Sequence, residues 1–218
     1  MKKFFPASVL LIAVTVIVSS FIIRRDNLGA SVPETGTKNL AAKWVLDKGH
    51  SNVKFTVTHM VVSEVEGSFK NFEGTVESSK PDFSDAVITF TVDVNSVDTD
   101  NERRDNHLKS DDFFNAEKFP QMKFQSTSFK PLGGKKYKLD GNLTIRDVTK
   151  PVSFDVTFGG TLDTKRDIVA GFKASTTINR FDYNLKWDRA TEAGGLVVAK
   201  DVVVSINGEF KQAKEQAK

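Results

Sequence analysis

The chain has 218 residues, no cysteine and a formal net charge of +3, and all of this excess charge lies in residues 1–30. The remainder is neutral, which gives no electrostatic footprint for nucleic acid and argues against a nucleic-acid partner. The absence of cysteine excludes disulfides, thiolate metal sites and a lipid-modified cysteine anchor.

The N-terminus has the pattern of an export signal. Lys2 and Lys3 precede an apolar run from Phe4 to Ile23, which corresponds to a positive n-region followed by an h-region. The run is longer than the about 7–15 residues of a cleavable signal and close to the roughly 20 that span a bilayer. We therefore expect residues 1–23 to be a signal peptide or an apolar helix that anchors the chain to the inner membrane. Either interpretation places the rest in the periplasm or cell envelope.

The next segment is polar and irregular, and we interpret residues 24–43 as a linker. From Trp44 onward, apolar residues recur at every second position, which is typical of strands with one buried face. The alternation returns in seven further segments: 69–76, 88–94, 122–128, 137–145, 152–158, 168–176 and 202–210. About eight antiparallel strands with short connections are enough to close a barrel that holds side chains or one small ligand. Residues 212–218 form a charged tail.

One polar island, Thr99–Pro120, interrupts the strand pattern. Thr99 and Glu102 have the spacing of a capping box, and the residues that follow favour a helix from Asp100 to Lys109. A single helical insert in an antiparallel β-protein suggests a lid or mouth on a barrel.

The island also carries a family resemblance. The island contains Asn101-x-x-Arg104-Asp105-x-His107-Leu108-x-Ser110-x-Asp112-Phe113-Phe114, followed by Phe119-Pro120 and Phe124-x-Ser126-Thr127. This run resembles the signature of the YceI-like, lipocalin-like lipid-binding proteins. Further matching blocks span residues 43–211: Trp44-x-Leu46-Asp47-x-x-His50-Ser51-x-Val53-x-Phe55, Gly67-Ser68-Phe69, Phe72-x-Gly74, Gly141-Asn142-Leu143-Thr144-Ile145-Arg146, Val148-Thr149-Lys150-Pro151-Val152 and Asn179-Arg180-Phe181-Asp182-Tyr183.

The resemblance implies an all-β fold over residues 44–211: an eight-stranded antiparallel lipocalin-like barrel with a short helical insert. It also implies an interior that takes an isoprenoid chain or a similar long apolar molecule. Asp147 and Asn184 stand where the family usually has glycine. Because both residue types tolerate left-handed backbone, we expect both turns to be kept.

Phenylalanine dominates the aromatic residues, with 18 against two tyrosines and two tryptophans. Phenylalanine rings pack against alkyl or prenyl chains without needing hydrogen bonds. For any single ring, ordinary core packing is the simpler interpretation. On the alternating apolar faces, the candidate ligand-lining residues are Phe55, Val57, Phe69, Ile88, Phe90, Phe124, Leu143, Phe154, Val156, Phe172, Val204 and Ile206.

A polar mouth is a second candidate feature, built from His59, Arg103, Asp105, His107 and Arg180. The arginines could clamp an anionic lipid group. The structural alternative, in which the island's charges solvate the helix and one Arg–Asp bridge pins it to the barrel, is favoured for charges on a short helix. Arg180 leaves the same two alternatives open, and His59 is equally well interpreted as a solvent-facing strand end.

Metal and catalytic sites find little support. The three histidines lack a metal-binding spacing, so we expect no metal site. His50 and Ser51 are adjacent and would point apart on an extended chain, and no Gly-x-Ser-x-Gly elbow is present. We therefore expect no cofactor and no enzymatic activity.

Two functions remain. The first is an exported binding protein that transports or sequesters a polyisoprenoid, an isoprenoid quinone or a fatty-acid-like lipid inside the barrel. The second is a non-catalytic interaction module with a solid core, tethered beside a membrane partner. A homodimer is compatible with either. A dry tunnel of several hundred Å³ would favour the binding function.

Overall fold

The structure is a computed structural model that describes residues 41–190 and 196–214. The apolar segment interpreted as a signal or anchor lies outside the described residues. Among the residues that are described, no helix is both long and apolar enough to cross a membrane.

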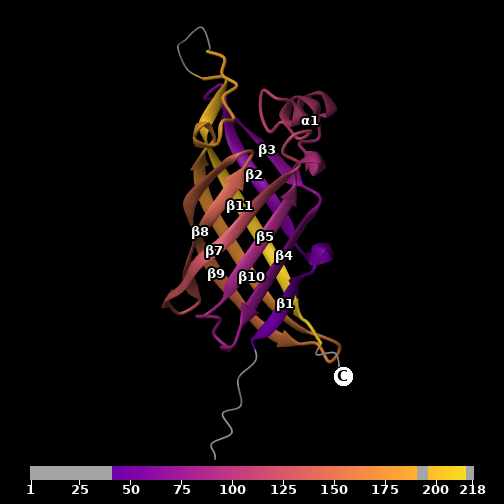
Figure 1. The fold of residues 1–218 in the computed structure, drawn as a ribbon, viewed down its shortest axis with the longest axis vertical. Coiled ribbons are helices and arrows are strands. Elements are labelled where there is room, and N and C mark those ends of the chain that lie inside the picture. The colour runs from indigo at the N-terminus through magenta and orange to yellow at the C-terminus, as the bar shows by residue number, and fades with distance from the viewer. Residues whose placement is uncertain (1–40, 191–195, 215–218) are drawn as a thin grey trace, which may run out of the picture. The chain divides into compact units, whose positions relative to one another are not determined.

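Strands dominate the described chain (Figure 1). The strands are β1 (Ala42–Leu46), β2 (Asn52–His59), β3 (Ser63–Phe69), β4 (Phe72–Ser78), β5 (Val87–Asp93), β6 (Val97–Asp98), β7 (Gln121–Gly133), β8 (Lys136–Ile145), β9 (Val148–Asp163), β10 (Ile168–Asn179) and β11 (Val198–Gln212). The helical elements are α1 (Glu102–Lys109) and the 3-10 turns η1 (Lys48–His50), η2 (Val94–Ser96) and η3 (Arg180–Tyr183).

Eight of these strands form a closed antiparallel ring in the order β1-β4-β5-β7-β8-β9-β10-β11, in which β11 returns to β1. The eight-stranded barrel with one short helical insert is thereby confirmed. Strands β2, β3 and β6 extend the sheet beyond the ring, because the long strand β11 pairs with β1 at its C-terminal end and with β2 from Val198 to Asn207.

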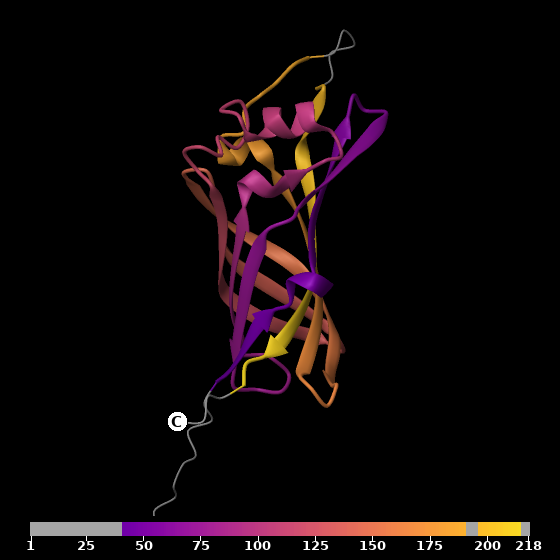
Figure 2. The same ribbon diagram turned by 90° about the vertical axis from the view of Figure 1, so that its right-hand side faces the viewer.

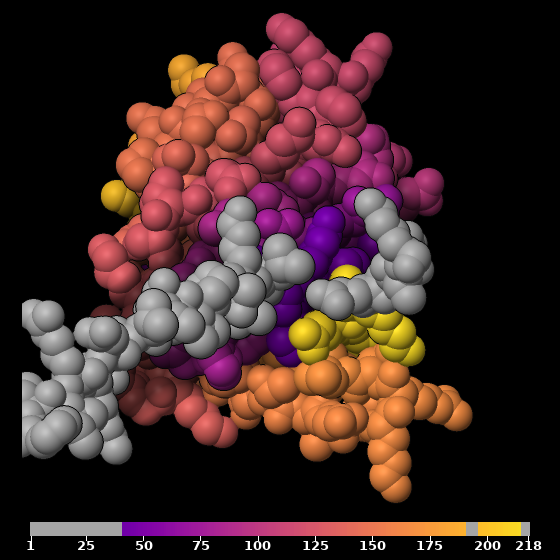
Figure 3. Space-filling model, turned by 60° about the horizontal axis from the view of Figure 1, so that its bottom comes forward, coloured from indigo at the N-terminus to yellow at the C-terminus, as the bar shows by residue number. Residues whose placement is uncertain are grey.

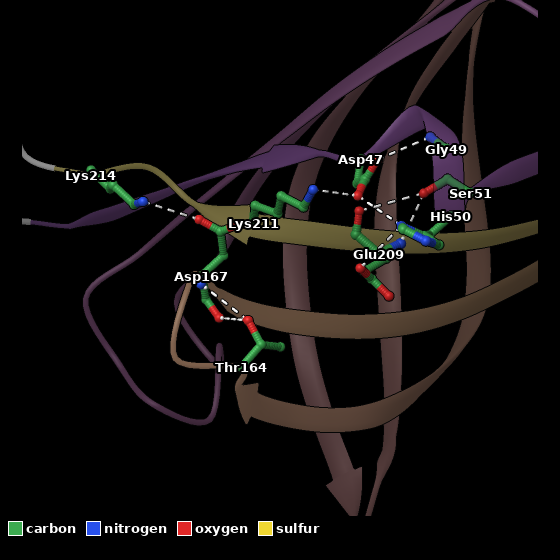
Figure 4. A network of polar contacts seen from close by, with 9 residues as sticks. All are labelled: Asp47, Gly49, His50, Ser51, Thr164, Asp167, Glu209, Lys211 and Lys214. Atoms are coloured by element: carbon green, nitrogen blue, oxygen red, sulfur yellow. Dashed lines mark hydrogen bonds and ion pairs between the residues drawn. The ribbon is translucent and has the colours of Figure 1, made fainter.

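The 3-10 turn η1 separates β1 from β2, and a polar network fixes this break (Figure 4). Asp47 accepts from the Gly49 amide at 3.0 Å, and its Oδ2 lies 2.9 Å from His50 Nδ1 and 2.7 Å from Lys211 Nζ. The Ser51 hydroxyl accepts from the Glu209 amide at 3.0 Å. These contacts join the break to β11, so the Asp-x-x-His-Ser block has a structural role here.

The network predicts a pH-dependent stability. The hydrogen bond and charge of Asp47, together with Glu209, raise the pKa of His50 above its usual 6.5. That contribution is complete below about pH 6.5 and is lost as the pH rises through the raised pKa. The bonds from Lys211 and His50 lower the pKa of Asp47, so its contribution is lost as the pH falls below 3.8. His50→Ala should therefore lower the free energy of unfolding more at about pH 5 than at about pH 9, measured by urea denaturation. An equal loss of unfolding free energy at the two pH values would contradict this prediction.

Helix α1 begins at Glu102, two residues later than the sequence predicts, and its N-cap is Asn101 and not Thr99. The Asn101 side chain accepts from the Arg104 amide at 3.0 Å. The predicted capping box is wrong because Asp100 adopts a left-handed φ of 58°, which a helical residue cannot have. Thr99 instead donates through its amide and hydroxyl to the Asp105 carboxylate, at 2.9 and 2.6 Å.

In the two turns where the family usually has glycine, the residue with a left-handed backbone is the predicted one in only one case. Asn184 has a φ of 61°, as predicted. At the β8–β9 turn the left-handed residue is Arg146, with a φ of 55°, and not Asp147 as predicted. The register of this hairpin, in which Ile145 pairs with Val148, places Arg146 at the first central position, where a type I′ or II′ turn requires a positive φ.

An aromatic plug fills the barrel end opposite α1. The loop between β4 and β5 carries Phe83 inside, where its ring lies 5.2 Å from those of Trp44 and Phe172 and 5.4 Å from that of Phe158. The Tyr137 hydroxyl donates to the Asp82 carbonyl at 2.8 Å and holds this loop in place. Figure 3 looks onto this end, where β1 in indigo lies beside the end of β11 in yellow.

Candidate functional site

The barrel contains a partly open, almost wholly apolar cavity of about 210 Å³ between this plug and α1. All twelve apolar residues that the sequence predicts as ligand-lining lie on its wall. They are brought together because one face of each strand points inward, as in the cross-strand pairs Phe90–Phe124 and Phe55–Val204. Their contact with a ligand stays a prediction.

Glycines in the wall allow phenylalanine rings to lie flat against the neighbouring strand. A Cβ added to Gly74 would lie 2.7 Å from the Phe90 ring, and one added to Gly67 would clash with the Phe55 ring. Each ring therefore covers a glycine of the neighbouring strand, where a larger residue would displace it. This close approach explains the glycines of the Gly-Ser-Phe and Phe-x-Gly blocks, Gly67 and Gly74.

Gly74→Ala should drive the Phe90 ring off the wall and into the cavity, because a contact of 2.7 Å is below any ordinary van der Waals distance. We expect a loss of about 1–3 kcal/mol in the free energy of unfolding, measured by denaturant titration. Gly171→Ala is the matched control, since a Cβ there meets nothing within 4 Å. The control should be neutral or gain about 0.5–1 kcal/mol as an alanine in a strand. Equal losses in both variants would contradict the explanation.

Helix α1 and the turn after it cover the other end of the cavity, to which they contribute Leu108, Phe113 and Phe114 (Figure 2). Arg146, in the β8–β9 turn, holds the turn after α1 in place. Its Nη1 donates to the carbonyls of Asp111 and Phe113 at 3.1 and 2.9 Å, and its Nη2 lies 3.0 Å from the Asp111 carboxylate. Sequence reasoning gave Arg146 no role. The only signal was its place at the end of a family block.

Arg180 is the one predicted mouth residue on the cavity wall, and its side chain is only 4% exposed. It donates four hydrogen bonds of 2.6–2.9 Å to backbone carbonyls, with the acceptors Leu185, Trp187, Val198 and Ala199. Burial lowers the pKa of the guanidinium from its ordinary value. Of the two alternatives for Arg180, an anion clamp or a structural contact, these bonds agree with the structural contact. They join the η3 end of the barrel to the start of β11.

The other four predicted mouth residues do not converge on one site. Arg103 is exposed on α1, and Asp105 is bonded to Thr99. His107 lies 2.8 Å from the Asp112 carboxylate and packs its ring edge-on against Phe113. His59 ends β2, half-buried, outside the cavity wall.

Among the described residues, one group of three could bring ligand atoms within 4.8 Å of one another for a metal ion: Asp47, His50 and Glu209. The Lys211 ammonium lies 2.7 Å from the Asp47 carboxylate, so a cation already neutralises it. The arrangement is explained as the ion-pair network at the β1–β2 break. The predicted absence of a metal site stays a prediction.

The chain is similar to known proteins in sequence and in fold. The YceI-like domain family matches residues 44–210. A UPF0312 protein of Staphylococcus aureus (strain N315) is 38% identical over 169 residues, which are 77% of this chain and 96% of the relative. The crystal structure of Burkholderia cenocepacia BcnA matches with a TM-score of 0.65 at 25% identity, covering 75% of this chain and 98% of that one.

Two further solved structures have the same fold. A Campylobacter jejuni YceI protein matches with a TM-score of 0.64 at 29% identity, covering 72% of this chain and 90% of that one. A polyisoprenoid binding domain from Saccharophagus degradans matches with a TM-score of 0.57 at 15% identity, covering 78% and 98%. At 15% identity, the last likeness shows the fold alone.

Proposed function

The chain belongs to the YceI-like domain family, and from this premise we propose that its barrel holds a long apolar ligand in the cell envelope, for transport or sequestration. The candidate ligands are a polyisoprenoid, an isoprenoid quinone or a fatty-acid-like lipid. The observation that carries the proposal is the apolar cavity between the Phe83 plug and α1. The envelope location rests on the apolar N-terminal run of the sequence.

Desolvation would supply the affinity. Each buried methylene contributes about 0.8 kcal/mol, so a chain of many carbons binds tightly without an ionic contact. Ordering of the ligand offsets part of this gain. The wall offers this ligand carbon surface and few polar groups, which favours a binding role over catalysis.

The cavity is somewhat smaller than the about 300–1,000 Å³ of pockets for drug-sized ligands. A long chain therefore requires wall side chains or the α1 cover to move, or else leaves part of itself outside the barrel. The Saccharophagus degradans domain, which is described as polyisoprenoid-binding, shares this fold.

Native mass spectrometry of the exported domain from Leu40 onward, followed by organic extraction, tests the proposal. We expect a discrete adduct that is released as an isoprenoid or fatty species. An apo mass under gentle conditions would overturn the proposal and favour the interaction module with a solid core.

A further inference from the structure

The tip of the β2–β3 hairpin combines exposed apolar side chains with a strained backbone. Met60, Val61 and Val62 are consecutive and are 47%, 75% and 86% exposed. Met60 and Val61 have left-handed φ values of 51° and 67°. A β-branched residue rarely adopts this conformation, and glycine or asparagine would hold it at lower cost. Folding alone would favour glycine or asparagine at these positions, yet the tip has apolar residues there.

Two of the three backbone amides of this tip are hydrogen-bonded. The Met60 amide donates to the Val197 carbonyl at 2.9 Å, and the Val62 amide donates to the His59 carbonyl at 3.2 Å. Exposed backbone donors make entry into hydrocarbon costly. A tip with two paired amides and three apolar side chains fits that requirement.

The tip also lies close to the cavity. Val57, which lies in β2 three residues before Met60, is on the cavity wall. The hairpin rises at the barrel end that carries α1 (Figure 2). Within the described residues, the outer edge of β3 pairs only at Ser68 and Phe69, with the two-residue strand β6. The hairpin therefore projects beyond the closed part of the barrel.

We propose that Met60, Val61 and Val62 insert into the interfacial region of a phospholipid bilayer and bring the α1 end of the barrel against the membrane. Glu64 and Glu66 are exposed directly below the tip and carry negative charge toward that surface. Insertion should thus be driven by apolar burial, and anionic lipid should weaken it. This docking role goes beyond the holding of a ligand and does not depend on it.

The absence of cysteine allows a single fluorophore to be attached to the full chain. Ser63→Cys, next to the intact apolar triplet, carries an environment-sensitive label. Lys135→Cys carries the same label in the β7–β8 turn at the other end, near the exposed Leu132. Lipid-stripped protein is mixed with phosphatidylcholine vesicles containing an acyl-chain quencher. We expect a blue shift and quenching at position 63 and neither at position 135.

Val61→Asn combined with Val62→Asn, in the Ser63→Cys background, tests the mechanism. Asparagine tolerates left-handed backbone, so the midpoint of thermal unfolding should be unchanged or raised. The equilibrium for tip insertion should fall about tenfold or more, since two apolar side chains no longer gain burial. Unchanged quenching in this variant, or equal quenching at positions 63 and 135, would overturn the proposal. A blue shift that needs no vesicles and grows with protein concentration would also overturn it, in favour of self-association.

Discussion

Arg180→Met is expected to lower the free energy of unfolding by about 3–5 kcal/mol, because it leaves four carbonyl oxygens without their charged donor. The methionine fills much of the volume, so the loss reports hydrogen bonding more than packing. Urea denaturation followed by circular dichroism measures it. Residues 185–187 and the start of β11 should also lose protection from hydrogen exchange, since they supply the four acceptors.

Two further variants control this result. Arg180→Lys keeps the charge but cannot reach four carbonyls with a single ammonium, so most of the loss should remain. Arg103→Met changes an exposed arginine on α1 and should fall within about 0.5 kcal/mol of the wild type. If Arg180→Met cost less than about 1 kcal/mol and only weakened lipid binding, Arg180 would serve the ligand and not the fold.

The barrel and its inner face could be predicted from the sequence because both depend on local period. Alternate residues of a strand point to the same side of the sheet, so Val53, Phe55 and Val57 all face the cavity. The predicted lining was therefore found on one cavity wall. The family resemblance supplied the closure into a ring, which alternation by itself does not specify.

The rest depends on contacts between distant segments. Arg146 and Arg180 bind backbone carbonyls, and such acceptors are present at every residue and leave no mark in the sequence. The helix start was misplaced for a similar reason. Thr99 is held by Asp105 and Arg104, and Asp100 turns left-handed, so the cap moves to Asn101. Side-chain competition of this kind is decided by the tertiary environment.

Ala174→Phe is expected to remove ligand binding while the barrel remains folded. Ala174 lies on the cavity wall, between Val156 and Ile206 on the two neighbouring strands. A ring at this position occupies space that the ligand would take. Excluding two methylenes, at about 0.8 kcal/mol each, already weakens binding more than tenfold. The amount of lipid extracted per mole of purified protein measures the loss.

The same substitution separates a ligand cavity from a solid core. In a solid core, an added ring strains its neighbours and costs about 1–3 kcal/mol or more of stability. In a cavity of about 210 Å³, the ring gains contacts, and the free energy of unfolding should stay equal or rise. Thr177→Phe places the same ring on the outer face of the same strand and should leave both lipid content and folding unchanged. Destabilisation by Ala174→Phe without any loss of lipid would remove the cavity from the binding mechanism, because lipid bound elsewhere is not displaced by a ring inside the barrel.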